Sequence, residues 1–221
     1  MPYYIVQWQR YTQACDDDLQ ARLAGPVTRS LERFLRDRGQ TGSGLIGWHL
    51  GCNSFLYQAD HLNLPGEGFS PSVMVALMRR ALAEAATASG DAAMAQVHLR
   101  AADEVERELL RRFWDSSRGA FIPGIDQGGL AQRLALYTDF VFPALYSRLP
   151  RAYAWCCLEA ADRRLWSPGG LFRMGELLPS GFGNDMVGVV QPSEAAEAYA
   201  ELGRSDCCFA LLPRTAEALT T

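Results

Sequence analysis

The sequence predicts an all-α fold of stacked helical hairpins with long loops at one end. Three observations predict it: a helical hairpin with regular apolar spacing in residues 70–122, an internal repeat of that hairpin, and three long connections between predicted helices. Of the 221 residues, 48% are hydrophobic, which is enough to form a core. We therefore expect one domain over residues 1–221, or a fragment of one.

The hairpin has recognisable start, turn and stop signals. Ser70-Pro71 predicts a helix start, because Ser can cap free amides and Pro in the first turn gives up no needed donor. Gly90 can adopt the left-handed conformation that ends a helix, and Asp91 can cap the next one. The predicted buried stripes are Met74, Leu77, Met78, Ala81, Leu82 and Ala85 in the first helix and Met94, Val97, Ala101, Val105, Leu109 and Phe113 in the second. Arg79, Arg80 and Glu84 lie off the first stripe, and His98 is predicted to be a core histidine.

The same pattern occurs elsewhere in the chain. The segment 14–46 aligns with the segment that begins at Ser89, and a third, shorter copy begins at Gly203. Repetition on this scale indicates hairpins that bury their apolar faces against one another. The matched pairs are Asp16 with Asp91, Leu35 with Leu110, and Gly44 with Gly119.

Helices are predicted near residues 3–15, 26–38, 71–89, 92–114, 136–147, 150–165, 193–202 and 205–218. Gly25-Pro26 and Pro192-Ser193-Glu194 are predicted helix starts, and short strands are expected around Leu45-Ile46 and Ala120-Ile122. The long connections 39–70, 115–135 and 166–191 are rich in Gly, Pro, Asn and aromatic residues. Function tends to lie on such loops when a rigid scaffold holds them.

Composition excludes several classes of function. The net charge is −4, and an acidic total argues against a phosphate-backbone partner, so we expect no nucleic-acid partner. No apolar run has the length of a membrane helix, and the N-terminus lacks a secretory signal, so a cytoplasmic protein is expected. The six cysteines form no CxxC pair near a His and are interpreted as free thiols rather than a metal site. No nucleotide-binding motif is present, and we expect neither a cofactor nor a metal.

The order of several motifs resembles a known family. SGLIGWHLGCNSF precedes the hairpin, which ends in FWDSSRGAFI; LYTDFVFPALYSRLP, GLFRMGE and VVQPSEAAEAYAELGRSDCCFALL follow. From about residue 40 to 221 this order resembles the six-hairpin (α/α)-toroid glycoside hydrolases, in particular bacterial α-L-rhamnosidase-like catalytic domains and the trehalase and mannosylglycerate hydrolase clan. The resemblance implies an (α/α)6-toroid type of fold and a carbohydrate substrate.

The chain departs from this family in two ways. Its sequence predicts fewer helices than the twelve of a complete six-hairpin toroid, which implies an incomplete ring. Where the trehalase clan has Gly-Trp-Asp, this chain has Gly47-Trp48-His49, and the rhamnosidase-like carboxylates lie outside the matched region. Three alternatives follow: a fragment, a shortened homologue that lacks one or both catalytic carboxylates, or a protein that completes its ring as a homo-oligomer.

The first long loop carries most of the candidate sugar-binding residues. Glycoside hydrolysis needs a protonated acid and a second carboxylate, and Asp60 is the best acid candidate because nearby aromatic residues could raise its pKa. A capping or ion-pairing role for Asp60 remains the alternative, and structural roles remain for His49 and His61. The candidate substrate-binding residues of this loop are Trp48, His49, Asn53, Tyr57 and His61.

The other two loops supply the remaining candidates. Glu176, in a Gly-bounded loop, is the candidate base, with pairing to Arg173 as its alternative. Asp185 and Asp126 are candidate substrate ligands, although Asp185 also fits a turn. Asp115 resembles a position of the family that usually serves structure, so the resemblance implies that it bonds loop backbone rather than acts in catalysis.

Together these observations favour a glycosidase that cleaves a glycosidic bond with paired carboxylates, inverting by analogy with the family. The alternative is a non-catalytic hairpin module for interaction or oligomerisation, derived from an incomplete toroid. A third interpretation, an isomerase or cyclase of the same fold, requires a His pair or an acidic cluster, and Asp16-Asp17-Asp18 instead fits a helix start.

Overall fold

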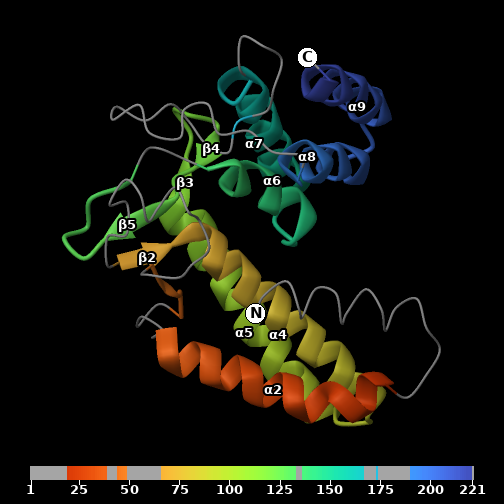
Figure 1. Cartoon of the computed structure of the whole chain (residues 1–221). Helices are drawn as coiled ribbons and strands as arrows, with labels where there is room; N and C mark the ends of the chain where they lie inside the picture. Colours follow the sequence, from red (N-terminus) through yellow and green to blue (C-terminus); the bar gives the residue numbers. More distant parts are fainter. Residues whose placement is uncertain are drawn as a thin grey trace.

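A computed structural model describes residues 19–38, 44–48, 66–132, 136–166, 173 and 190–220. Helices dominate these residues, and the strands are short, so the all-α prediction is confirmed (Figure 1). The predicted helix 3–15 lies outside the described residues. The helices are α2 (Leu19–Arg38), α4 (Phe69–Ala88), α5 (Ala92–Phe113), α6 (Tyr137–Leu145), α7 (Arg151–Arg164), α8 (Val190–Glu201) and α9 (Ser205–Thr220). The strands are β1 (Gly47–Trp48), β2 (Gly66–Gly68), β3 (Trp114–Asp115), β4 (Ala120–Phe121) and β5 (Gly124–Asp126).

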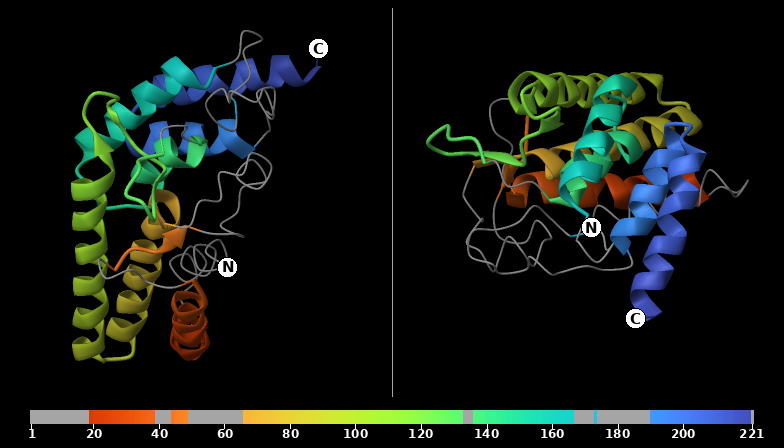
Figure 2. Two further views of the ribbon diagram at one scale, coloured as in Figure 1. Left: turned by 90° about the vertical axis from the view of Figure 1, so that its left-hand side faces the viewer. Right: turned by 90° about the horizontal axis from the view of Figure 1, so that it is seen from above.

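The helices form consecutive hairpins, α4–α5, α6–α7 and α8–α9, and α2 packs on α4. Figures 1 and 2 show α2, α4 and α5 as one group and α6 to α9 as a second group beside it. Helix α6 joins the groups because it contacts both α4 and α8. Within the described part of the chain, no helix has the length and apolar character needed to cross a membrane.

Helix α4 is buried on nearly all sides, because α2, α5 and α6 all pack against it. The predicted stripe is buried except for half-buried Leu77, but Arg80 is buried as well, contrary to prediction. Its guanidinium pairs with Glu106 at 2.5 Å and Asp103 at 2.9 Å, which compensates the charge. A helix that is packed on several sides therefore buries residues outside its apolar stripe, which a one-sided pattern predicts to be exposed.

The start of α4 also differs from its prediction. The N-cap is Gly68, without a side-chain hydrogen bond, and Ser70 lies inside the first turn. Ser72 instead links the first turn of α4 to the segment before β1: its hydroxyl accepts from the amide of Ile46 at 3.0 Å and donates to the carbonyl of Gly68 at 2.6 Å. The hydroxyl of Ser70 instead points to another helix, as described below.

Helix α5 keeps the predicted period but shifts its buried face in the first turns. Met94 and Val97 are 46% and 50% exposed, so these two assignments were wrong. The buried face runs through Ala95, His98 and Ala102 before it reaches the predicted residues Val105, Leu109 and Phe113. At 3.6 residues per turn, positions 95, 98 and 102 lie closer to the face of residues 105, 109 and 113 than positions 94 and 97 do. The predictions of a buried His98 and of an Asp91 cap, which accepts from the amide of Met94 at 2.9 Å, are confirmed.

Helix α2 begins at Leu19, so the predicted start at Gly25-Pro26 was wrong. Proline fixes φ near the helical value and removes one amide donor, so it weakens an interior turn without forbidding it. Pro26 is exposed, whereas Val27, Leu31 and Leu35 are buried on the opposite face. Helix α8 begins two residues before the predicted Pro192.

The predicted repeat is visible in the backbone. Gly44 and Gly119 both have positive φ, 77° and 63°, after helices that end at matched positions. The residues that follow each glycine, Leu45-Ile46 and Ala120-Phe121, are completely buried. The predicted strand at Ala120 is confirmed, and the one near Ile46 lies at Gly47–Trp48.

Candidate functional site

The described parts of the first and second long connections meet in a small antiparallel sheet with strand order β1-β2-β5. The sheet lies where α4 begins, at the end of the hairpins opposite the tight turn 89–91 (Figure 1). Strand β1 and strand β2 flank residues 49–65, so their pairing brings the two ends of that segment together. The loops at this end of the stack are the candidate site.

One row of this sheet contains two predicted substrate ligands. Trp48 pairs with Gly66, and Gly66 pairs with Asp126, so the three backbones line up across the sheet. A Cβ on Gly66 would lie 2.1 Å from the carbonyl oxygen of Ile125, a distance no side chain tolerates. Position 66 must therefore remain glycine for β2 and β5 to pair this closely.

Asp126 holds the turn that follows it. Its Oδ1 accepts from the amide of Leu130 at 2.7 Å, and its own amide donates to the carbonyl of Leu130 at 3.0 Å. The side chain is half-buried, and within the described residues Oδ2 has no hydrogen-bond partner. One oxygen thus fixes the loop while the other can accept a hydrogen bond from a ligand, and the substrate role of Asp126 stays a prediction.

The other predicted site residues lie outside the described residues. This holds for both predicted catalytic carboxylates, Asp60 and Glu176, and for the side chain of Trp48. The remaining substrate-binding candidates outside the described residues are His49, Asn53, Tyr57, His61 and Asp185. The structure describes the anchors of these segments: β1 and β2 for the first, and Arg173, whose amide donates to the carbonyl of Leu165 at 2.8 Å, for the second.

Glu67 is a buried carboxylate that sequence reasoning missed. It lies in β2 between two glycines, and its side chain pairs with Arg112 of α5, with Oε2 2.7 Å from Nη2. Because the guanidinium compensates the carboxylate, the pair anchors the sheet to the last turn of α5. The available signal in the sequence was the run Gly66-Glu67-Gly68, because an acid between two glycines has no neighbouring side chain to pair with and so indicates a partner elsewhere in the fold.

Asp139 is a second missed carboxylate, and it is completely buried. Its Oδ2 accepts from the amide of Leu136 at 2.9 Å, and its Oδ1 accepts from the hydroxyl of Ser70. Ser70 also contacts Thr138, with the two hydroxyl oxygens 3.2 Å apart. The carboxylate thus joins the first turns of α4 and α6, where helix dipoles favour negative charge. An acid in the first turn of a helix was the sequence signal.

Asp115 has the structural role that the sequence predicts. Its Oδ1 accepts from the amide of Ser117 at 3.0 Å and from the hydroxyl of the same residue at 2.6 Å. The hydroxyl bond is the main reason that the pKa of Asp115 lies below its usual value. This carboxylate stabilises the turn between β3 and β4.

The cysteines within the described residues are free thiols: Cys156, Cys157, Cys207 and Cys208. Burial raises the pKa of Cys157 to about 12, so it stays protonated at neutral pH and acts as a small apolar side chain. The free-thiol prediction is confirmed for these four. Cys15 and Cys52 lie outside the described residues.

Comparison with known proteins identifies the fold. No protein-family model and no curated protein matches the chain. Among solved structures, a GH78 family rhamnosidase of Bacillus sp. GL1 has 17% identity and a TM-score of 0.68 over 96% of this chain and 20% of that chain. A rhamnosidase from Klebsiella oxytoca with rhamnose bound has 12% identity and a TM-score of 0.63 over 95% of this chain and 36% of that chain.

A GH63 mannosylglycerate hydrolase from Thermus thermophilus is also similar, with 13% identity and a TM-score of 0.54 over 72% of this chain and 41% of that chain. Identities this low show the fold alone. The chain has the hairpin stack of (α/α)-toroid glycoside hydrolases and spans about a fifth of the length of the GH78 rhamnosidase. The predicted resemblance is confirmed at the level of fold.

Proposed function

We propose that this chain is a carbohydrate-active glycoside hydrolase or part of one, and that it cleaves a glycosidic bond at the loop end of its hairpin stack. The observation that carries the proposal is the rhamnosidase-like fold over 96% of the chain. Asp60 is the general acid and Glu176 the general base, in an inverting reaction by analogy with the family.

The described part of the site supports this assignment through its anchors. Segment 49–65, which contains the candidates Asn53, Asp60 and His61, is flanked by two paired strands that hold its ends together. Trp48, Gly66 and Asp126 pair in one row of the sheet, so two of the candidate substrate-binding residues belong to neighbouring positions of the same small sheet. His49, Tyr57 and Asp185 complete the proposed substrate contacts.

The test is hydrolysis of a panel of 4-nitrophenyl glycosides, beginning with the α-L-rhamnoside. Asp60→Asn and Glu176→Gln should each lower kcat/KM by at least about a hundredfold, the usual contribution of a positioned acid or base. Asp115→Asn is the matched control, because its carboxylate bonds a turn, and it should keep most of the activity. Full activity in both Asp60→Asn and Glu176→Gln would show that the assigned roles are wrong.

A second candidate function is a non-catalytic interaction module that forms a homo-oligomer. The observation that favours it is Phe209 of α9, which is 70% exposed. No turnover on the whole panel, together with a dimeric mass by light scattering that Phe209→Ser converts to a monomeric mass, would support this candidate against the first. A monomeric mass for the unaltered chain would contradict it.

A further inference from the structure

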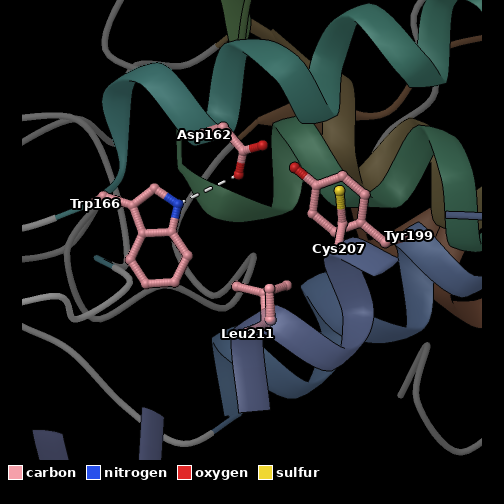
Figure 3. A pocket seen from close by; sticks show the side chains of 6 residues that line it. Asp162, Trp166, Tyr199, Cys207 and Leu211 are labelled. Carbon is pink, nitrogen blue, oxygen red and sulfur yellow. Dashed lines mark hydrogen bonds between the residues drawn. The ribbon is translucent and has the colours of Figure 1, made fainter. Parts of the chain in front are cut away.

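A pocket of about 320 Å³ lies between α7, α8 and α9 (Figure 3). Its lining comes from the end of α7, the end of α8 and the first turns of α9. None of the six described lining residues is among those assigned to glycoside hydrolysis. The lining residues are Asp162, Trp166, Tyr199, Cys207, Ala210 and Leu211.

The indole of Trp166 is held against the pocket by a side-chain hydrogen bond. Its Nε1 donates to Oδ1 of Asp162 at 3.3 Å, one helical turn earlier in the chain (Figure 3). Tyr199 lies across the pocket with its hydroxyl toward Asp162 and donates to the carbonyl of Leu158 at 3.3 Å. Two aromatic rings therefore lie on either side of one carboxylate.

Asp162 supplies the charge of this pocket. Burial, and next the neighbouring Asp162, raise the pKa of Tyr199, and burial raises the pKa of Cys207, so both groups stay neutral at pH 7. The guanidinium of nearby Arg204 forms two bonds to Asp206, at 2.7 and 2.8 Å, and also donates to Sγ of Cys207 at 2.9 Å, so the carboxylate of Asp206 compensates its charge at the pocket wall. Within the described residues, no basic side chain forms an ion pair with Asp162.

The chemistry of the lining selects among ligand classes. An anion would face the carboxylate with no basic side chain among the six lining residues. A sugar would place several hydroxyls against Ala210, Leu211 and Cys207, where they lose water without gaining partners. A small alkylammonium ion meets the carboxylate with its charge and the aromatic rings and Leu211 with its methyl groups.

We propose that this pocket binds a small organic cation of the alkylammonium type, with Asp162 as the counter-ion and Trp166 as the ring that contacts the cation. The proposal does not rest on the proposed function, because its binding test needs no glycosidic activity.

Calorimetric titration with choline chloride and with its neutral isostere 3,3-dimethylbutan-1-ol tests the charge requirement. Choline should bind at least about tenfold more tightly than the alcohol, since the cation gains both the ion pair and the ring contact. Asp162→Asn should remove this preference, because the amide oxygen can still accept from the indole while the charge is gone. Glu159→Gln is the matched control: Glu159 accepts from Nε1 of Trp155 at 2.8 Å on the same helix, outside the pocket, and this variant should bind choline normally.

Leu211→Trp gives an independent test, because a large side chain should fill the cavity and block choline without changing any charge. Circular dichroism checks that each variant is folded. If Asp162→Asn does not fold, the result for Leu211→Trp decides. Equal binding of choline and the alcohol, no binding of either, or an equal loss in Glu159→Gln would overturn the proposal. Binding of rhamnose or glucose that Asp162→Asn abolishes would also overturn it in favour of a sugar.

Discussion

The hairpins α4–α5 and α8–α9 have the same type of turn but differ in how their helices pack against neighbours. In the first, the amide of Asp91 donates to Ala86 at 2.8 Å and that of Gly90 to Thr87 at 3.0 Å. In the second, Arg204 donates to Tyr199 at 2.8 Å and Gly203 to Ala200 at 2.9 Å. Both are Schellman turns, and their glycines have φ of 81° and 79°.

The packing around the two turns is different. Helix α4 lies between α2, α5 and α6, and thirteen of its residues are buried, whereas the main partner of α9 is α8. The side chains of α9 that the structure describes include one buried apolar residue, Leu211, and the highly exposed Phe209. Local sequence therefore determines the turn, while the neighbouring hairpins determine how much each helix buries.

The largest difference is expected between a phenylalanine of each hairpin. Phe113 is completely buried, with its ring centroid 5.9 Å from that of Phe69, so Phe113→Ala should lower the free energy of unfolding by about 3–5 kcal/mol. Phe209→Ala should change it by less than about 0.5 kcal/mol, because this side chain is 70% exposed. Urea denaturation measures both, and equal losses would show that the α9 face is buried in solution.

An equal and intermediate effect is expected at the two turns. Gly90→Ala and Gly203→Ala should each lower the free energy of unfolding by about 1–2 kcal/mol, because an L side chain is strained at positive φ. No atom lies within 4 Å of a Cβ at either position, so backbone strain is the main cost. A large effect at only one turn would mean that the two turns are not equivalent in solution.

The smallest effect is a pH dependence confined to the first hairpin. Burial, and next the charge of Arg79, lower the pKa of His98, whose Nδ1 lies 3.3 Å from Nη1 of Arg79, while Glu32 acts in the opposite direction. The unfolded chain therefore binds the proton more readily than the folded chain. The contribution of neutral His98 to the free energy of unfolding is complete above the unfolded pKa of about 6.5 and declines as the pH falls below it. His98→Gln should flatten the loss of stability between pH 7.5 and 5.5, measured by urea denaturation at each pH. An unchanged slope would contradict this role.

The sequence predicted features that depend on local spacing. The tight turn at Gly90, the cap at Asp91 and the buried end of α5 depend on residues a few positions apart, and all three are confirmed. The sheet was not predictable in the same way, because Gly66 and Asp126 are far apart in the sequence and their strands are very short. The prediction that Arg80 lies on the solvent side was wrong for a related reason, because its partner Glu106 lies on the next helix. For the candidate site, the sequence supplied the residues and the structure supplied the anchors of their loops.

Gly66 has a consequence for how mutational data on this protein should be interpreted. Any side chain at this position collides with the backbone of β5, so every substitution should separate β2 from β5 and disturb both loops at once. In a screen for lost activity, position 66 would rank with the catalytic residues although glycine has no functional group. Thermal denaturation of the purified variants would distinguish the two, because a true catalytic substitution leaves the melting temperature largely unchanged.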